Sequence, residues 1–157
     1  IRDRLIQQVL QNQWKQVGVE VIIKNVPART LFGETLRKQQ FTGMAQIAWT
    51  TTLEQQPTDW LASVAIPSAA NNYSGSNFSH FNNAAMDQLI SQLVGELDPA
   101  KRKPVWAQIQ KLYAQELPVL PLFFRTHVYV VPKWLTGVIK PGELPTGPLA
   151  VEYWGVK

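Results

Sequence analysis

The chain has 157 residues, of which 45% are hydrophobic and 17% charged, a balance that suits one globular domain with its own core and excludes a disordered chain. It contains no cysteine, so disulfides, thiol catalysis and cysteine-held zinc are excluded. The net charge of +4 is spread over scattered lysines and arginines, without the basic run that nucleic-acid binding favours. No apolar stretch approaches the roughly 18 residues of a membrane span.

The first fifty residues predict a helix followed by a strand–helix–strand unit. Apolar residues share one face through residues 2–17, and Gly18 follows where helices often end. Residues 19–26 are rich in β-branched side chains on both faces, which predicts a strand buried on both sides. A second helix over 28–38 and a strand over 44–49 complete a βαβ-like unit. We therefore expect an α/β fold with a mixed sheet flanked by helices.

A polar, turn-rich stretch covers residues 50–79. Apolar side chains within 58–64 are spaced for a short docking helix, whereas 71–77 consists of turn-forming residues. So long a stretch without regular structure is usually functional or disordered in a compact domain. A binding surface is therefore expected here.

Two amphipathic helices meet at Asp98-Pro99, where Asp98 suits a helix N-cap and Pro99 suits the first helical turn. Apolar side chains recur at three- and four-residue spacing in both helices, which predicts that each buries one face. The residues expected to point inward are Met86, Leu89, Ile90, Leu93, Val94 and Leu97 in the first helix, and Val105, Trp106, Ile109, Leu112 and Tyr113 in the second.

The rest of the chain predicts short strands. Residues 119–124 and 127–131 read as an antiparallel pair that turns at Arg125-Thr126. Residues 132–135 suit a single turn, and 149–154 suit a last strand.

The order and spacing of four stretches resemble the C-terminal lobe of the extracytoplasmic solute-binding proteins of ABC importers, in the family that binds dipeptides, oligopeptides and nickel chelates. These stretches are Gln13 to Val21, Asn83 to Asp87, Asp98 to Arg102 and Leu117 to Leu122. The resemblance covers most of the chain, from about residue 2 to residue 138.

The resemblance implies a periplasmic-binding-protein-like lobe, with residues 1–157 as a single domain of a longer two-lobe protein. Such a protein captures a peptide or peptide-like solute in the periplasm and delivers it to an ABC permease. It is not an enzyme, needs no cofactor, and is made as a precursor with a signal peptide. We expect the strand that precedes residue 2 in the family, and the N-terminal lobe, to be absent from this sequence. The sheet edge left open would then pair with a second copy.

Trp49 ends a predicted strand, and in α/β sheets ligands gather at the carboxyl ends of strands. A core tryptophan that caps the sheet is an equally good interpretation of Trp49. Asn72, Tyr73 and Ser74 match a family loop that faces the ligand cleft, where amide and phenol groups can bind a peptide backbone or a sugar. An ordinary turn with asparagines at positive φ explains the same residues as well.

Thr50, Thr51 and Thr52 complete the predicted ligand contacts. In peptide-binding relatives an aspartate stands three residues after the tryptophan and pairs with the peptide's α-amine, but here Thr52 occupies that place. A buried ammonium needs a carboxylate partner. Either Glu54 or Asp59 substitutes, or the contacted end of the ligand is neutral, or the amine is met by the absent lobe. The ligand thus stays open among peptide, sugar, opine and metal chelate.

No residue pattern in the sequence indicates a catalytic or metal site. His80 and His127 are far apart in the sequence and lack the spacing of zinc ligands. The basic residues 101–103 either dock the permease or form a solvated helix start. A stand-alone carbohydrate- or protein-interaction module that uses the tryptophan, tyrosine and asparagine side chains is the alternative function.

Overall fold

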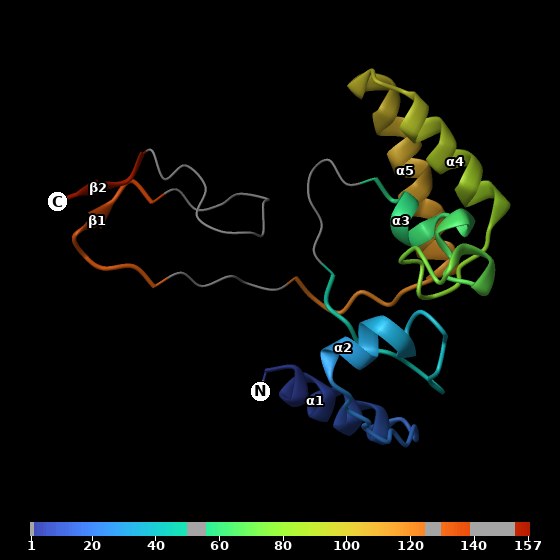
Figure 1. The fold of residues 1–157 in the computed structure, drawn as a ribbon, viewed down its shortest axis with the longest axis horizontal. Helices are drawn as coiled ribbons and strands as arrows, with labels where there is room; N and C mark the ends of the chain where they lie inside the picture. The colour runs from blue at the N-terminus through green and yellow to red at the C-terminus, as the bar shows by residue number, and fades with distance from the viewer. Residues whose placement is uncertain (1, 50–55, 125–129, 139–152) are drawn as a thin grey trace.

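The computed structural model describes residues 2–49, 56–124, 130–138 and 153–157 (Figure 1). In these ranges the chain is mainly helical. The elements are α1 (Arg2–Gln16), α2 (Ala28–Thr30), the π-helical turn η1 (Leu31–Thr35), α3 (Thr58–Leu61), the 3₁₀ turns η2 (Ser63–Ala65) and η3 (Ala69–Asn71), α4 (Ala84–Gly95), α5 (Pro99–Glu116), β1 (Leu135–Thr136) and β2 (Gly155–Val156).

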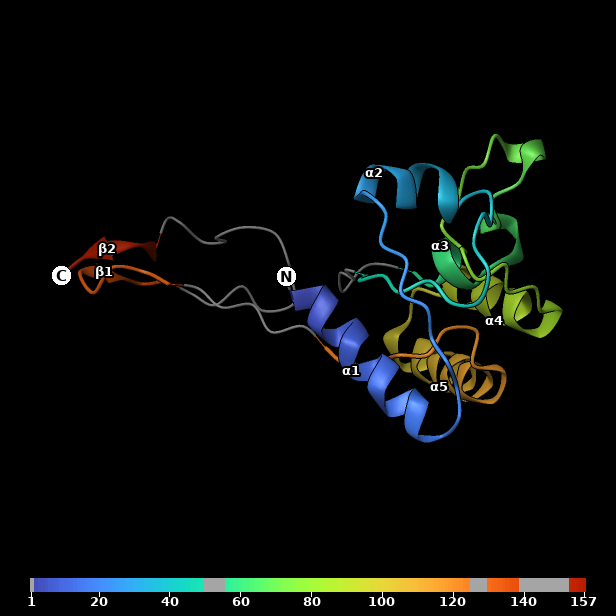
Figure 2. The ribbon, with the colours of Figure 1, turned by 90° about the horizontal axis from the view of Figure 1, so that it is seen from below.

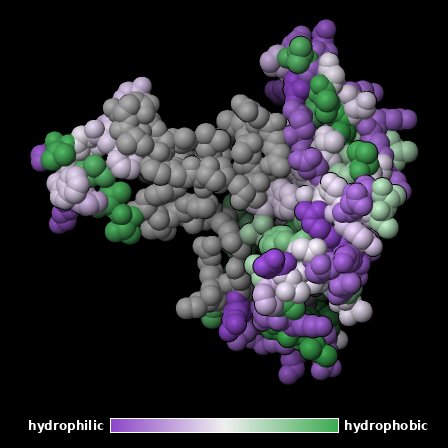
Figure 3. All heavy atoms as spheres, in the orientation of Figure 1, coloured by the Kyte–Doolittle hydropathy of each residue, from purple (hydrophilic) through white to green (hydrophobic). Residues whose placement is uncertain are grey.

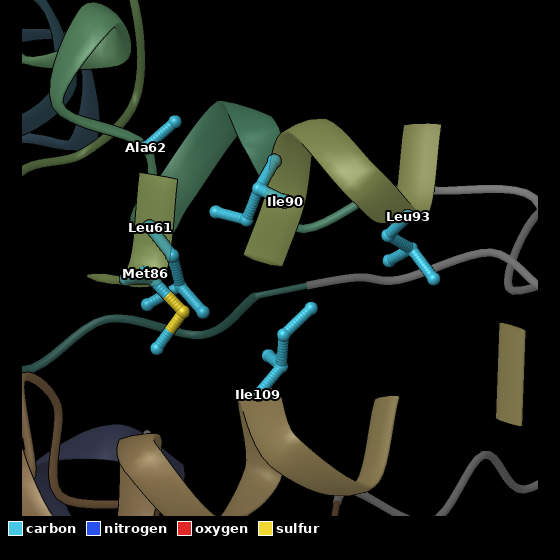
Figure 4. Packing of buried hydrophobic residues seen from close by; sticks show 6 residues of the cluster. All are labelled: Leu61, Ala62, Met86, Ile90, Leu93 and Ile109. Atoms are coloured by element: carbon cyan, nitrogen blue, oxygen red, sulfur yellow. The ribbon is translucent and has the colours of Figure 1, made fainter. Parts of the chain in front are cut away.

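The hydrophobic core lies where α3, α4 and α5 meet (Figure 4). Met86, Ile90 and Leu93 of α4 are buried, as is Ile109 of α5. Val105, Trp106, Leu112 and Tyr113 of α5 pack on this cluster as partly buried residues. The predicted inward faces of the two helices are therefore confirmed, except that Val94 and Leu97 are exposed. Val94 lies at the flank of the buried stripe, and Leu97 lies beyond the end of α4.

Side-chain caps set the ends of α4 and α5. Asn83 Oδ1 accepts hydrogen bonds from the backbone N–H of Ala85 (3.0 Å) and Met86 (3.1 Å) at the start of α4. Asp98 Oδ1 accepts from the N–H of Ala100 (2.9 Å), so the predicted N-cap is confirmed. At its other end α5 stops at Leu117, which takes a left-handed φ of 46° just before Pro118.

The predicted first helix is confirmed as α1, with Gly18 at a φ of +83° after its end. The second predicted helix is formed as α2 and η1, after which Leu36 is buried. The predicted short helix in the turn-rich stretch is also confirmed, since α3 and η2 occupy residues 58–61 and 63–65.

The predicted strands are wrong in the described residues. No strand pairing is formed by residues 19–26, 44–49 or 119–124. In the described residues the paired strands are β1 and β2, which run antiparallel with Leu135 opposite Val156. A strand is stable only when a neighbour satisfies its backbone N–H and C=O groups. No such neighbour lies beside these three segments in the part of the chain that the structure describes. The predicted βαβ unit is therefore not formed there.

Two further predicted strands lie wholly or mostly outside the described residues. For the predicted strand 127–131, residues 127–129 are outside the described residues, and so is the turn at 125–126 before it. For the predicted strand 149–154, residues 149–152 are outside them. Residues 130–131 are described and unpaired. The predicted turn over residues 132–135 is confirmed, since the N–H of Leu135 donates to the carbonyl oxygen of Pro132 (3.1 Å), and β1 begins at Leu135.

Figures 1 and 2 both show β1 and β2 beside each other and apart from the helices. Both views also place α4 against α5 and α3. Apolar side chains interrupt the hydrophilic surface over α4 and α5 (Figure 3). Among the described residues, none of the helices has the length and apolar character that crossing a bilayer requires.

Candidate functional site

Trp49 belongs to a cluster of three aromatic rings. Its indole stacks on that of Trp60, with ring centroids 6.4 Å apart and planes 24° apart. The ring of Phe78 meets Trp49 edge to face, with centroids 6.0 Å apart. Both geometries are favourable for aromatic pairs. Because Trp49 remains 38% exposed, it is packed on its neighbours and still offers part of its ring to solvent or a ligand.

The loop of residues 72–75 follows η3 and is built from left-handed backbone. Asn72 and Tyr73 have φ values of 54° and 55°, and Gly75 has a φ of +95°. Non-glycine residues reach this region at a cost and remain there only where surrounding contacts hold them. The predicted turn conformation is thus confirmed, and the asparagine at positive φ with it. A role of these residues in ligand binding remains a prediction.

Gly75 is required by a close approach of two backbone segments. A Cβ on this residue would lie 2.1 Å from the carbonyl oxygen of Ala65, far inside van der Waals contact. That same oxygen accepts a hydrogen bond from the N–H of Asn77 (3.1 Å), so it cannot move away freely. The absence of a Cβ at Gly75 therefore allows the loop to lie close to η2.

Arg37 joins the loop to the aromatic cluster. Its Nη1 donates to the carbonyl oxygens of Tyr73 (2.7 Å) and Gly75 (3.1 Å). Its guanidinium carbon lies over the ring of Phe78, 5.8 Å from the centroid, which is the geometry of a cation–π contact. Trp49 and the 72–75 loop, which are predicted separately from sequence, are therefore brought to one place by Arg37 and Phe78.

The buried amide of Asn77 holds the chain that leads into the loop. Its side chain is 0% exposed. Nδ2 donates to the carbonyl oxygens of Ala62 (3.0 Å) and Phe81 (2.8 Å), and Oδ1 accepts from the N–H of Phe81 (3.0 Å) and the hydroxyl of Ser79 (3.0 Å). The hydrogen-bonding capacity of the amide is thus fully used. Asn77 therefore organises the loop and is not available to a ligand.

A second polar contact fixes η2 to α4. Asp87 accepts from the N–H of Ser63 at Oδ1 (2.8 Å) and from the Ser63 hydroxyl at Oδ2 (2.5 Å). Asp87 thus has a structural partner, beyond its place in the first turn of α4, where a negative charge suits the helix dipole.

Lys38 adds a positive charge beside the loop. Its Nζ lies 2.5 Å from Glu34 Oε2 and 5.5 Å from the centre of the Tyr73 ring. The hydrogen bond and charge of Glu34 raise the pKa of Lys38 above its ordinary value. The ammonium therefore stays charged through neutral pH beside the phenol of Tyr73.

The predicted ligand contacts divide into three groups. Trp49 lies in the aromatic cluster, and Asn72, Tyr73 and Ser74 lie in the loop that Arg37 holds, with Asn72 and Ser74 exposed. The third group, Thr50, Thr51 and Thr52, lies outside the described residues, as does Glu54. Asp59 is exposed in the first turn of α3.

Three residues of the site are not found by sequence reasoning, namely Arg37, Trp60 and Phe78. Their contacts join residues far apart along the chain, and no local spacing signals such a contact. The Arg37-Lys38 pair and the aromatic residues near a turn-rich stretch are the nearest signal that the sequence contains.

In the basic turn at the start of α5, Lys101 and Lys103 are exposed, as the predicted solvated helix start requires, whereas Arg102 has an additional internal role. Arg102 Nη1 donates to the carbonyl oxygens of Leu93 and Glu96, each at 2.7 Å, and Nη2 donates to Gln56 Oε1 (3.2 Å). These carbonyls belong to the end of α4, where they lack partners within the helix. Arg102 is therefore an internal cap that joins α4 to α5.

Two other kinds of site were considered in the described part of the chain, a metal site and an apolar hollow. Among the described residues there is no group of three or more histidine, cysteine, aspartate or glutamate side chains that could hold a metal ion. An apolar hollow of about 370 Å³ lies between α1 and the segment after α5, lined by Leu5, Ile6, Val9, Leu10, Leu122 and Phe123. None of the predicted contact residues lines it.

The exposed part of the Trp49 ring lies in the same region as the amide of Asn72, the phenol of Tyr73 and the hydroxyl of Ser74. Apolar surface combined with a few polar groups is typical of sites that bind small molecules. Comparison with known proteins gives relatives that are named as peptide-binding proteins. The chain is 27% identical over 138 residues to the oligopeptide-binding protein OppA of Bacillus subtilis, and 25% identical over 126 residues to di/tripeptide-binding protein 1 of Pseudomonas aeruginosa.

A solved structure shows the same likeness in three dimensions. The oligopeptide-binding protein from Thermus thermophilus, determined in complex with a pentapeptide, matches 88% of this chain with a TM-score of 0.76 and 34% sequence identity. The chain spans 24% of that protein, and 24% and 22% of the two sequence relatives. No protein-family model matches the chain.

These likenesses agree with the resemblance found in the sequence. The chain is similar in sequence to two peptide-binding proteins, and its fold is similar to a segment of a solved oligopeptide-binding protein. The match to the solved structure confirms the expected fold class, although the described residues form a helix-rich structure with a small sheet.

Proposed function

We propose that this chain contributes one wall of the ligand cleft of an extracytoplasmic solute-binding protein that captures a peptide and delivers it to an ABC permease. The observation that carries the proposal is the joining of Trp49 to the 72–75 loop through Phe78 and Arg37. The aromatic face suits apolar peptide side chains, and the exposed Asn72 and Ser74 suit the peptide backbone. The relatives named as peptide-binding proteins support the same ligand class.

The whole protein would work by closing two lobes over the ligand about a hinge and presenting the closed form to the permease. It would act outside the cytoplasm, as a binding protein and not as an enzyme, with no cofactor. The single lobe, residues 1–157, would enclose only part of the ligand. We therefore expect the chain alone to bind peptide weakly, with a dissociation constant in the range of about 1 mM.

Thr52 suggests which part of the peptide this wall meets. An α-ammonium that is buried on binding needs a carboxylate. Threonine cannot supply one, and the two carboxylates nearby, Glu54 and Asp59, stand at other positions in the sequence. The wall formed by this chain would then meet the peptide away from its free amine.

Titration of the ¹⁵N-labelled chain with penta-alanine, followed by two-dimensional NMR, tests the proposal because it detects millimolar binding residue by residue. We expect shifts at the indole N–H of Trp49 and at the amides of residues 50–52 and 72–74. N-acetylated penta-alanine should shift the same signals equally, because no carboxylate of this wall meets the amine. Maltotriose serves as the control ligand and should shift none of them.

Two results would overturn the proposal. Shifts with maltotriose but not with penta-alanine would favour a stand-alone carbohydrate-binding module. Submicromolar peptide affinity of the chain alone would contradict a wall that encloses only part of its ligand.

A further inference from the structure

We infer that Arg37 is a positioning residue, which holds the 72–75 loop in its ligand-facing shape and fixes it to Trp49. The inference rests on the proposed function, because it names the residue that keeps the proposed contacts in register. Arg37 lies just after η1, 36 residues before Tyr73 in the sequence, so its contacts tie together two distant parts of the chain.

The first step concerns the strained backbone of the loop. Tyr73 has a φ of 55°, a conformation that costs free energy for a non-glycine residue, and Gly75 has a φ of +95°. Arg37 Nη1 donates to the carbonyl oxygens of both residues, at 2.7 and 3.1 Å. Hydrogen bonds from a charged donor are stronger than neutral ones. Arg37 therefore stabilises the left-handed conformation of the loop at these two residues.

The second step concerns the orientation of the guanidinium itself. Arg37 Nε donates to the carbonyl oxygen of Phe32 (3.1 Å), which anchors the side chain to η1. The guanidinium lies over Phe78, and Phe78 contacts Trp49 edge to face. Separate partners in η1, the loop and the aromatic cluster thus fix one rigid, planar group. A lysine has a single flexible ammonium and cannot reproduce this arrangement.

The third step is that Arg37 contributes to the loop and not to the main core. The core residues of α3, α4 and α5 are held by their own apolar contacts. Arg37 is partly buried, and its hydrogen bonds go to Phe32, Tyr73 and Gly75. Loss of Arg37 should therefore loosen the loop while the helices remain packed.

Arg37→Lys tests the inference, with Arg102→Lys as the matched control. Arg102 also donates through Nη1 to two carbonyl oxygens, but those carbonyls belong to Leu93 and Glu96 at the end of α4. Both variants keep the charge and lose the planar fork. Only the first should affect the loop.

Two measurements are made on each variant of the 157-residue chain. The first is amide hydrogen exchange at Tyr73 and Asn77, whose N–H groups donate to Ser68 (2.7 Å) and Ala65 (3.1 Å) within the loop region. The second is the size of the NMR shifts that a fixed concentration of penta-alanine induces. For Arg37→Lys we expect about tenfold faster exchange at both amides and shifts reduced about fivefold. Arg102→Lys should leave exchange at both amides and the peptide shifts within about twofold of the unchanged chain.

The outcomes separate the inference from the proposed function. Unchanged exchange at Tyr73 and Asn77 in Arg37→Lys overturns the positioning role, whatever the peptide does. Faster exchange with undiminished peptide shifts overturns its link to the ligand and leaves Arg37 as a structural residue only. If the unchanged chain shows no peptide shifts, the proposed function fails, while hydrogen exchange still decides whether Arg37 holds the loop.

Discussion

The indole of Trp49 stacks on the indole of Trp60 at a centroid distance of 6.4 Å, across the junction between the N-terminal segment and α3. Through this pair, Trp49, at the end of the segment 44–49, packs against α3, which contributes to the hydrophobic core. Trp49 is thereby both a packed and a partly exposed side chain. The packing expected of Trp49 is present, but against Trp60 and Phe78 and not against a sheet, and its contact with a ligand remains a prediction.

Substitution of Trp49 separates its packing from its contact with a ligand. Stacked indoles couple their electronic transitions, so Trp49→Leu and Trp60→Leu should both remove an exciton couplet from the circular dichroism spectrum. Each should lower the free energy of unfolding by about 1–3 kcal/mol through loss of aromatic packing. Trp49→Leu alone should also abolish the penta-alanine shifts at residues 72–74.

Trp134→Leu is the control for these variants, because Trp134 is exposed and precedes β1, away from the cluster. It should keep the couplet and the peptide shifts. Equal loss of peptide shifts in Trp49→Leu and Trp60→Leu would mean that Trp49 acts only through packing.

Glycine substitutions test the close approach of the loop to η2. In Gly75→Ala the new Cβ would lie 2.1 Å from the Ala65 oxygen, and the φ of +95° is unfavourable for alanine. We expect the free energy of unfolding to fall by about 2–4 kcal/mol, measured by urea denaturation. Gly43→Ala has a similar φ of +82° with nothing within 4 Å, so it should cost only the backbone strain of about 1–2 kcal/mol. Equal effects of the two substitutions would contradict the close approach.

Neighbouring residues of α4 test the position of the core. Leu93 is 0% exposed, whereas Val94 next to it is 52% exposed. Leu93→Ala should lower the free energy of unfolding by about 2–5 kcal/mol because it opens a cavity between α4 and α5. Val94→Ala should change it by less than about 0.5 kcal/mol. Thermal and urea unfolding measure both, and the reverse order would place α4 with its other face inward.

Tyr113 gives the fold a dependence on alkaline pH. Its hydroxyl donates to the carbonyl oxygen of Val119 (2.7 Å), which ties the segment after α5 back onto the helix. Burial raises the pKa of the Tyr113 phenol above its ordinary value of 10.0. The neutral phenol is thus favoured in the folded chain. Its contribution to stability is fully present below pH 10.0 and is lost as the pH rises through the folded pKa.

Tyr113→Phe isolates this contribution. At about pH 7 the variant should be less stable by about 0.5–1.5 kcal/mol, the net value of one hydrogen bond. The difference in unfolding free energy between the two proteins should shrink above pH 10.0, when the tyrosine of the parent ionises. A difference that stays constant well above that pH would argue against a partly buried, hydrogen-bonded phenol.

Local sequence signals identified the elements that are stabilised by contacts close in the sequence. The cap at Asp98, the buried stripe of α4 and the glycine after α1 were all predicted because each depends on residues within one or two helical turns. The same applies to the left-handed turn at Asn72. The resemblance to the family was read from four stretches of the sequence, and relatives named as peptide-binding proteins agree with it.

The predicted strands failed for a reason that local signals cannot contain. Residues 19–26 have strong strand composition, yet a strand forms only when another segment pairs with it. In the described residues that partner is absent. Pairing is a property of the whole fold, and the chain spans only 24% of the solved relative.

The sequence by itself determined the longer helices, the cap at Asp98, most of the inward faces, the resemblance to peptide-binding proteins, and the stretch in which ligand contacts are expected. Only the tertiary structure decided how those contacts are assembled. Arg37 and Phe78 join Trp49 to the 72–75 loop, and Arg102 closes the end of α4. Periodicity and capping depend on interactions between residues close in the sequence, so they can be predicted from it. The contact of Arg37 with Tyr73 joins residues 36 positions apart, and no local sequence pattern indicates such a contact.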